Sequence, residues 1–408
     1  MYMSSCSSFQ VMAKPIGPIC NIGCKYCFYL EKEKLFPNNE NFKMADNILE
    51  SYIKQYIESQ NTQTITFTWQ GGEPTLLGVN YFRKIVELQQ TFSAGKTISN
   101  CIQTNGTLLT DEFCIFLKEN SFLVGLSIDG PPKLHNAYRV DKKGLPTYDK
   151  VIKGLNLLKK HQIEFNTITV VNKVNSKKPI EVYEFLKKIG STFIQFIPLV
   201  ERLPNEEAKI LGVDLAMPPK VDEDVKLPVT EWSVEPKQYG EFLSTIFDKW
   251  VKEDVGKVFV QLFDVALGNW SGLQPGGICV FSENCGNAVA LEHDGTVYSC
   301  DHYVYPHYRL GNISTDSLGD MISSEKQISF GSDKSKTLPL YCRNCEVKFA
   351  CHGECPKHRF IRTPDGEGGL NYLCSGYKKF FNHIRPQMNI MTEFLRQCKL
   401  PSEIMRSR

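Results

Sequence analysis

The stretch that decides the fold is Cys20-Asn-Ile-Gly-Cys24-Lys-Tyr-Cys27-Phe-Tyr29, in which three cysteines are spaced C-x3-C-x2-C. Three thiolates can hold three irons of a [4Fe–4S] cluster and leave the fourth iron open to a small molecule. A closed structural zinc site needs four ligands, and no histidine lies near this stretch. The spacing therefore favours a reactive iron–sulfur cluster over structural zinc or free thiols, and Gly23 lets the loop turn tightly around it.

The overall composition is that of a soluble globular protein, with 42% hydrophobic and 23% charged residues among 408. Forty-seven Lys and Arg against 45 Asp and Glu give a net charge of +2, without the basic block of a nucleic-acid binder. No run approaches the ~18 apolar residues of a membrane helix, and the first residues lack the apolar core of a signal peptide. We therefore expect a cytoplasmic protein of two or three domains that binds neither nucleic acid nor membrane.

Predicted strands and helices alternate on both sides of the cysteine loop. Periodicity predicts strands at 10–14, 64–69, 98–103, 122–128, 164–171 and 193–199, and helices at 44–60, 81–91, 111–120, 148–161 and 179–189. This alternation predicts right-handed βαβ units on a parallel sheet, with about six units against the eight of a closed barrel. Polar and glycine-rich segments follow the strands, where such barrels place their chemistry.

The rest of the chain divides into further regions. We expect an α/β fold in which a partial (β/α)6 TIM-like barrel occupies residues 1–236. Its last part, 201–236, contains five prolines and is predicted as a loop that either borders the mouth of the site or is a solvated connector. A connecting helical segment at 237–275, including a helix at 236–252, is followed by an irregular metal-braced domain at 276–385 and a C-terminal helix and tail at 386–408.

A second group of cysteines lies in the metal-braced domain. It comprises Cys279, Cys285, Cys300, Cys342, Cys345, Cys351, Cys355 and Cys374. Eight thiolates are enough for two fully ligated four-iron clusters, although 342–355 alone also fits a zinc ribbon. Four isolated cysteines remain. Cys101 and Cys114 are expected as small core residues, and Cys6 and Cys398 as terminal residues without a metal role.

Several motifs together resemble a known family. They are the cysteine run 20–29, Gln70-Gly-Gly-Glu-Pro-Thr-Leu76, Gln103-Thr-Asn-Gly-Thr-Leu108, Gly125-Leu-Ser-Ile-Asp-Gly-Pro131 and Tyr298-Ser-Cys-Asp301. From about Val11 to about Pro386 the chain resembles the anaerobic sulfatase-maturating enzymes, radical S-adenosylmethionine (SAM) proteins with a SPASM domain. The long insertion 201–236 and the segment 198–200 depart from the family pattern.

The resemblance implies an activity, cofactors and partners. It implies oxidation of a Cys or Ser residue in a sulfatase peptide to Cα-formylglycine, by hydrogen abstraction with a 5′-deoxyadenosyl radical, deprotonation by a base and electron transfer to auxiliary clusters. The cofactors implied are three [4Fe–4S] clusters and SAM. The partners implied are an unfolded or nascent sulfatase polypeptide and an electron donor such as flavodoxin or ferredoxin.

The resemblance also implies a role for each matching residue. Asp301 would be the catalytic base, and Tyr29 and Gln70 would contact the peptide. Residues implied to contact SAM are Tyr26, Gly71, Gly72, Glu73, Ser127, Arg139 and Val200. Cys20, Cys24 and Cys27 would hold the SAM-binding cluster. One auxiliary cluster would be held by Cys279, Cys285, Cys300 and Cys355, and the other by Cys342, Cys345, Cys351 and Cys374.

Two alternatives remain open at this stage. Another SPASM peptide maturase, for example one that forms thioether crosslinks, would need an open iron in an auxiliary cluster, against eight cysteines for two clusters. A zinc-braced binding module on an α/β scaffold would be colourless and stable in air, whereas an iron–sulfur enzyme would be brown and oxygen-sensitive.

Overall fold

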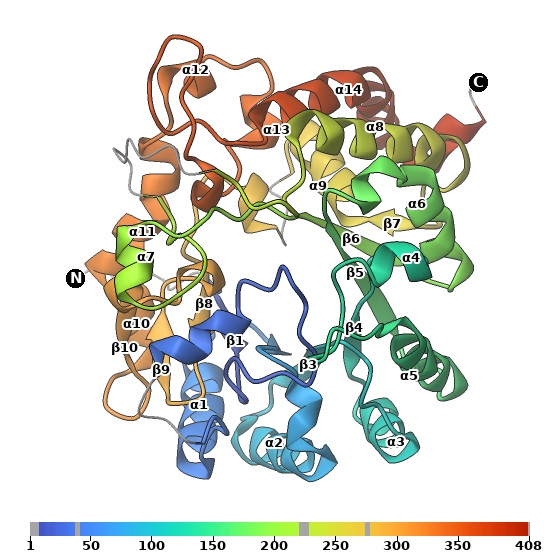
Figure 1. Ribbon diagram of the computed structural model, residues 1–408. Helices are drawn as coiled ribbons and strands as arrows, with labels where there is room; N and C mark the ends of the chain where they lie inside the picture. Colours follow the sequence, from blue (N-terminus) through green and yellow to red (C-terminus); the bar gives the residue numbers. More distant parts are fainter. Residues whose placement is uncertain (1–7, 37–40, 220–227, 274–277, 407–408) are drawn as a thin grey trace.

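A computed structural model describes residues 8–36, 41–219, 228–273 and 278–406. Their strands form one ten-stranded sheet in the order β10-β9-β8-β1-β2-β3-β4-β5-β6-β7, which curves into an incomplete barrel with helices outside it (Figure 1). The strands are β1 (Gln10–Ala13), β2 (Thr64–Trp69), β3 (Thr97–Thr104), β4 (Leu123–Ser127), β5 (Phe165–Val171), β6 (Phe193–Pro198), β7 (Phe259–Val260), β8 (Ala288–Leu291), β9 (Thr296–Tyr298) and β10 (Arg309–Asn312).

Strands β1 to β7 pair in parallel and are joined by helices, as the alternation predicted. The helices of this part are α1 (Asp46–Glu58), α2 (Val79–Phe92), α3 (Asp111–Glu119), α4 (Pro132–His135), α5 (Tyr148–Lys160), α6 (Pro179–Lys188), α7 (Glu206–Ile210), α8 (Pro236–Glu253) and α9 (Gln261–Trp270). Each of the six predicted barrel strands and five predicted barrel helices is present within a few residues of its expected bounds. The partial α/β barrel is confirmed.

Two apolar cores hold the helices on the outer surface of the sheet. In β2 the side chains of Ile65, Phe67 and Trp69 are buried in alternation and pack under α1 and α2. On the other side, β6 packs beneath α8 and α9, where Phe196 meets Phe242 with ring centroids 5.1 Å apart. Because the outer surface of the sheet is covered by these helices, the site can form only at the ends of the strands and in the loops that follow them.

The metal-braced domain extends the same sheet. Strand β8 pairs in parallel with β1, from Gln10 opposite Ala288 to Ala13 opposite Leu291, and β9 and β10 follow antiparallel. Its helices are α10 (Leu318–Ser323), α11 (Glu325–Lys336), α12 (Leu340–Arg343), α13 (Lys348–Cys351) and α14 (Cys374–Arg396). The short 3-10 helices are η1 (Leu30–Leu35), η2 (Pro74–Leu77), η3 (Asn175–Lys177), η4 (Cys279–Phe281), η5 (Asp301–Tyr303), η6 (Pro306–Tyr308), η7 (Pro356–His358) and η8 (Pro401–Met405).

Helices α8 and α14 lie side by side and join the two regions (Figure 1). A Cβ atom on Gly240 would lie 2.5 Å from the carbonyl oxygen of Gly376, and one on Gly376 would lie 2.1 Å from that of Pro236. Only glycine permits so close an approach. The helix α14 starts at Cys374 and continues across residues 385 and 386, where a domain boundary was predicted.

The insertion after β6 packs against η1, which follows the cysteine loop, and against the metal-braced domain. The backbone N–H groups of Asp214 and Leu215 donate to Glu31 Oε2 at 2.5 and 3.0 Å. Glu201 forms a buried ion pair with Lys357, 2.5 Å long. The described parts of the insertion are therefore packed against η1 (Leu30–Leu35) and the metal-braced domain; the acidic run 222–224 lies outside the described residues.

Candidate active site

The three cysteines of the first motif converge in the loop after β1. Burial raises the pKa of Cys20 to about 11 and that of Cys24 to about 12, and the neighbouring thiols add to both shifts. Burial likewise raises the pKa of Cys27. A metal cation offsets the cost of thiolates at such a place, so the loop fits a cluster bound through three thiolates.

The glycine pair after β2 lies directly against this loop. The N–H of Gly72 donates to the carbonyl of Gly17 at 2.7 Å, and that of Glu73 donates to Ile19 at 2.9 Å. A Cβ on Gly72 would lie 1.9 Å from the Ile19 oxygen. Gly71 adopts φ +125°, which favours glycine. The two glycines therefore allow backbone-to-backbone contact between the two loops.

Glu73 links the loop after β2 to the loop after β3 through hydrogen bonds. Its buried carboxylate accepts hydrogen bonds from the Thr75 and Thr104 hydroxyls at 2.6 and 2.7 Å and from the Asn105 N–H at 2.7 Å. Asn105 in turn donates to Asn21 at 2.9 Å, beside Cys20. The carboxylate of Glu73 is thus engaged within the protein, and its predicted contact with SAM would have to use the backbone.

Arg139 lies behind the cysteine loop in a buried network. Its Nη1 donates to the Tyr26 hydroxyl at 3.1 Å, and that hydroxyl donates to Asp129 Oδ2 at 2.6 Å. Among the described residues, the buried Nε of Arg139 has no hydrogen-bond partner. An unpaired guanidinium donor beside the cluster loop fits an incoming carboxylate such as that of SAM.

The other predicted contacts differ in what they offer a ligand. The Ser127 hydroxyl, at the end of β4, accepts from Gln103 Nε2 at 2.8 Å. The buried Nε2 of Gln70 finds no partner within the described part of the chain, so this amide remains available to a peptide. Val200 is 2% exposed and packs in the core beneath α8, which is an ordinary structural position.

Asp301 reaches the barrel mouth from the metal-braced domain. It forms an ion pair with Lys14 at the end of β1, and the Lys14 ammonium also lies 3.8 Å from the ring centroid of Tyr29. The Tyr29 hydroxyl donates to buried Glu292 at 2.5 Å. Burial pushes the pKa of Asp301 upward, but the Lys14 ammonium and His302 outweigh it, and the net shift is downward. Asp301 is therefore ionised and able to accept a proton.

The eight later cysteines form two separate groups. We call Cys279, Cys285, Cys300 and Cys355 the first thiol set, and Cys342, Cys345, Cys351 and Cys374 the second thiol set. Burial raises the pKa of three thiols in the first set, and neighbouring thiols of that set raise it further: Cys285, Cys300 and Cys355. Burial and neighbouring thiols of the second set likewise raise the pKa of Cys342, Cys351 and Cys374. The structure therefore brings together the same two groups of four that the family resemblance implies.

A tight turn carries the chain from the second set to the first. His352, Gly353 and Glu354, between Cys351 and Cys355, all have positive φ, between 48° and 71°. The Arg359 guanidinium donates to four backbone carbonyls, on His352, Gly353, Glu354 and Lys334. This clamp supports a strained backbone that non-glycine residues rarely adopt.

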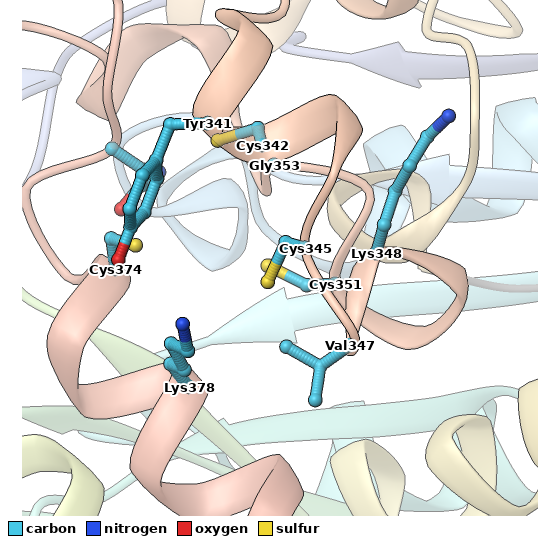
Figure 2. Close-up of a pocket in the computed structure, with 10 residues that line it drawn as sticks. Tyr341, Cys342, Cys345, Val347, Lys348, Cys351, Gly353, Cys374 and Lys378 are labelled. Carbon is cyan, nitrogen blue, oxygen red and sulfur yellow. The ribbon is translucent and has the colours of Figure 1, made fainter. Parts of the chain in front are cut away.

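The second thiol set lines a pocket, shown in Figure 2 with Tyr341, Lys348 and Lys378 around it. Across residues 8–36, 41–219, 228–273 and 278–406, no three His, Cys, Asp or Glu side chains come together closely enough to hold one metal ion. Four thiols around one pocket supply the full ligand set of a four-iron cluster.

The isolated cysteines lie elsewhere. Cys114 is buried in the core with α1 to α3, Cys101 is half-buried in β3, and Cys398 is exposed after α14. Cys6 lies outside the described residues.

Comparison with known proteins identifies the family. A radical SAM superfamily model matches residues 15–186, and a SPASM iron–sulfur cluster-binding domain model matches 279–346. A serine-type anaerobic sulfatase-maturating enzyme of Bacteroides thetaiotaomicron is 48% identical over 406 residues, covering 100% of this chain and 96% of that relative. This chain belongs to the anaerobic sulfatase-maturating enzymes.

Two further similarities agree with this sulfatase-maturating assignment. A cysteine-type anaerobic sulfatase-maturating enzyme of Clostridium perfringens is 34% identical over 391 residues, covering 93% of this chain and 97% of that relative. A solved structure of native anSMEcpe with bound AdoMet and Cp18Cys peptide matches with a TM-score of 0.81 and 32% identity, covering 95% of this chain and 100% of the other. As a radical SAM enzyme with a SPASM domain, this sulfatase-maturating enzyme uses [4Fe–4S] clusters and SAM.

Sequence reasoning missed several residues of the site. Lys14 and Glu292 hold Asp301 and Tyr29, and Asp129 holds Tyr26. A charged residue that directly follows an apolar strand, as Lys14 follows 10–13, is the signal that could have revealed one of them.

In the described part of the chain, no helix is long and apolar enough to cross a membrane.

Proposed function

We propose that this chain oxidises a serine or cysteine residue of an unfolded or nascent sulfatase polypeptide to Cα-formylglycine. The observation that carries the proposal is the position of Asp301, a carboxylate paired with Lys14 where the barrel and the SPASM domain meet. A carboxylate there would supply the proton acceptor that this oxidation needs. The names of the Bacteroides and Clostridium relatives support the same function.

The cofactors would be held by three groups of cysteines and a set of loop residues. Cys20, Cys24 and Cys27 would hold the cluster that binds SAM, and each four-cysteine set would hold an auxiliary cluster. SAM would contact Tyr26, Gly71, Gly72, Ser127, Arg139 and the backbone of Glu73, whereas the predicted contact at Val200 has no support in its buried position beneath α8. When bound, SAM and its cluster supply hydrogen-atom abstraction from the β-carbon of the target residue.

Asp301 would accept the proton of the target side chain on a carboxylate oxygen. Lys14, whose side chain is 3% exposed, forms an ion pair with this carboxylate, which would orient it and keep it ionised. Gln70, with its unpaired amide, and Tyr29 would contact the peptide. Four thiols in each auxiliary set would leave no iron open, which disfavours the thioether-forming alternative.

We further propose serine as the preferred target, because the serine-type relative is 48% identical whereas the cysteine-type relative is 34% identical. A hydroxyl is harder to deprotonate than a thiol. A serine substrate therefore depends at least as strongly on a positioned base such as Asp301.

The test is Asp301→Asn, which keeps the size and hydrogen bonding of the side chain but removes the proton acceptor. SAM cleavage depends on other residues, so the variant should still form 5′-deoxyadenosine. Formylglycine yield should fall on the order of 10²–10⁴-fold, the usual contribution of a positioned base. The decrease should be at least as large for a serine peptide as for a cysteine peptide. Near-normal yield from both peptides would show that the base lies elsewhere.

A further inference from the structure

Helix α11 turns a polar face toward the rest of the metal-braced domain. Its buried residues are Gln327, Gly331 and Lys334, whose spacing along the helix places them on one face. A surface helix ordinarily buries an apolar stripe. The buried face of α11 is instead held by polar contacts, and these contacts lie at the first thiol set.

Gly331 and Gln327 contact backbone beside the cysteines. The Cys285 N–H donates to the Gly331 carbonyl at 3.0 Å, and a Cβ atom on Gly331 would lie 2.6 Å from the Cys285 oxygen. The Gln327 amide donates to the carbonyls of Gly286 and Ser299 at 2.8 and 3.2 Å. Both acceptors are sequence neighbours of cysteines in the first thiol set, so α11 holds segments that carry these thiols.

Lys334 brings a positive charge to the same place. It is fully buried, and its Nζ donates to the carbonyls of Cys279 at 2.5 Å and Val280 at 2.9 Å. Within the described part of the chain, no carboxylate forms a hydrogen bond or an ion pair with this ammonium. A buried ammonium without a counter-charge is costly, so an anion is expected beside Lys334 in the working enzyme.

The first thiol set supplies that anion when it holds its cluster. Four thiolates outweigh the positive charge of an oxidised four-iron core, so the bound cluster carries a net negative charge. The charge of Lys334 reaches these thiols. Burial raises the pKa of Cys279 and Cys285, and the Lys334 ammonium is the strongest influence in the opposite direction on both.

Two carboxylates around the same set already have partners. Asp301 is paired with Lys14, and the buried Glu354 carboxylate lies 2.9 Å from His358 Nδ1. Their own partners offset part of their negative charge. Lys334 therefore remains available to balance the charge of the cluster.

The second thiol set has a different charge environment. Lys378, which lines its pocket, is paired with Glu346 at 3.5 Å, and Lys348 is exposed to solvent, which screens its charge. The Arg359 guanidinium lowers the pKa of thiols in both sets, against the larger effect of burial, and so does not distinguish them. The buried ammonium of Lys334 is therefore a difference between the two sets.

We propose that Lys334 is a positioning residue that acts as the counter-ion of the cluster in the first thiol set and raises the reduction potential of that cluster. Reduction adds a negative charge, which a buried ammonium stabilises. The inference rests on the proposed function, in which one hydrogen atom and one proton leave the target side chain. Closing its carbon–oxygen double bond then releases one electron, and a raised potential favours transfer of that electron to the cluster of the first set.

The experiment is an anaerobic redox titration of the iron-loaded enzyme, followed by electron paramagnetic resonance with and without SAM. SAM alters the signal of the cluster that it binds, so the two signals that do not respond belong to the auxiliary clusters. Lys334→Met removes the charge, Lys334→Gln keeps a hydrogen-bond donor without charge, and Lys334→Arg keeps both. The matched control is Lys336→Met, at an exposed position of the same helix.

One auxiliary potential should fall in Lys334→Met and in Lys334→Gln. We expect a decrease of at least about 59 mV, which is a ten-fold change in the one-electron equilibrium constant. The signal that shifts should be the one that Cys285→Ala removes. Lys334→Arg and Lys336→Met should keep the wild-type potentials.

Iron content gives a second measure of the same charge. Loss of about a third of the iron from Lys334→Met and Lys334→Gln, but not from Lys334→Arg, would also support the inference. Unchanged potentials in Lys334→Met, a wild-type potential in Lys334→Gln, a shift in another signal, or loss of iron from Lys334→Arg would each overturn it. The titration needs no peptide, so the proposed function fails separately, if the wild type with SAM and dithionite forms no formylglycine.

Discussion

Replacing Gly72 with alanine should detach the β2 loop from the cysteine loop. The added Cβ would lie 1.9 Å from the Ile19 oxygen and 2.4 Å from its carbonyl carbon. Ordinary contact begins near 3.4 Å, so the two loops must separate by about 1.5 Å. The atoms in the way belong to backbone, and no side-chain rotation relieves the clash.

The cost follows from the bonds that this separation breaks. Two backbone hydrogen bonds are lost or stretched: the one that the Gly72 N–H donates to the Gly17 carbonyl and the one that the Glu73 N–H donates to the Ile19 carbonyl. Each buried backbone group left unpaired costs about 1–3 kcal/mol, and overpacking adds about 1–3 kcal/mol. We therefore expect a loss of about 3–9 kcal/mol at the junction that positions Cys20 and its neighbours.

Three measurements check this prediction in the anaerobically reconstituted variant: iron per chain, SAM affinity and the thermal unfolding midpoint. Iron should fall by about a third, the share of one cluster in three, with loss of SAM binding and a lower midpoint. Gly319→Ala is the control, since a Cβ there meets its nearest atom at 3.7 Å. If Gly72→Ala matches this control in all three measurements, the reasoning about the loop contact is refuted.

Three other substitutions test the SPASM domain. Cys355→Ala should lower iron content and folding yield more than Cys101→Ala, because only the former removes a proposed cluster ligand; equal iron in the two would contradict the ligand assignment. Arg359→Met should lower the free energy of unfolding by about 2–4 kcal/mol because four carbonyls lose their donor, and an unchanged denaturant midpoint would show that the clamp is dispensable. Gly376→Ala should cost about 1–3 kcal/mol by forcing a Cβ against the Pro236 carbonyl; an unaltered thermal midpoint would count against close packing of α8 and α14.

Regular periodicity made the barrel predictable. In strand 64–69 every second side chain is buried and those between are exposed or half-buried, and the sequence located both ends of the strand. The two-residue β7 and four-residue β8 are too short to show a period, and they form because they pair with existing strand edges. Pairing of β8 with β1 joins residues more than 270 positions apart, which no local pattern predicts.

The site shows a similar division. The cysteine loop and the Gly71–Glu73 motif were recognisable because their residues are close in sequence. The pairing of Lys14 with Asp301 depends on the tertiary fold, as does the burial of Val200. Spacing gave eight later cysteines but not their grouping, which came from the family resemblance and agrees with the geometry.

The most direct test of the central claim uses the iron-loaded enzyme, SAM, dithionite and two sulfatase peptides that differ only in Ser or Cys at the target position. After anaerobic incubation, mass spectrometry should show that the serine peptide has lost two hydrogen atoms, that the cysteine peptide has become the same aldehyde, and that 5′-deoxyadenosine has formed. An enzyme with Cys20, Cys24 and Cys27 all replaced by alanine should give none of these products. Formation of 5′-deoxyadenosine by the wild type with no aldehyde in either peptide would contradict the account.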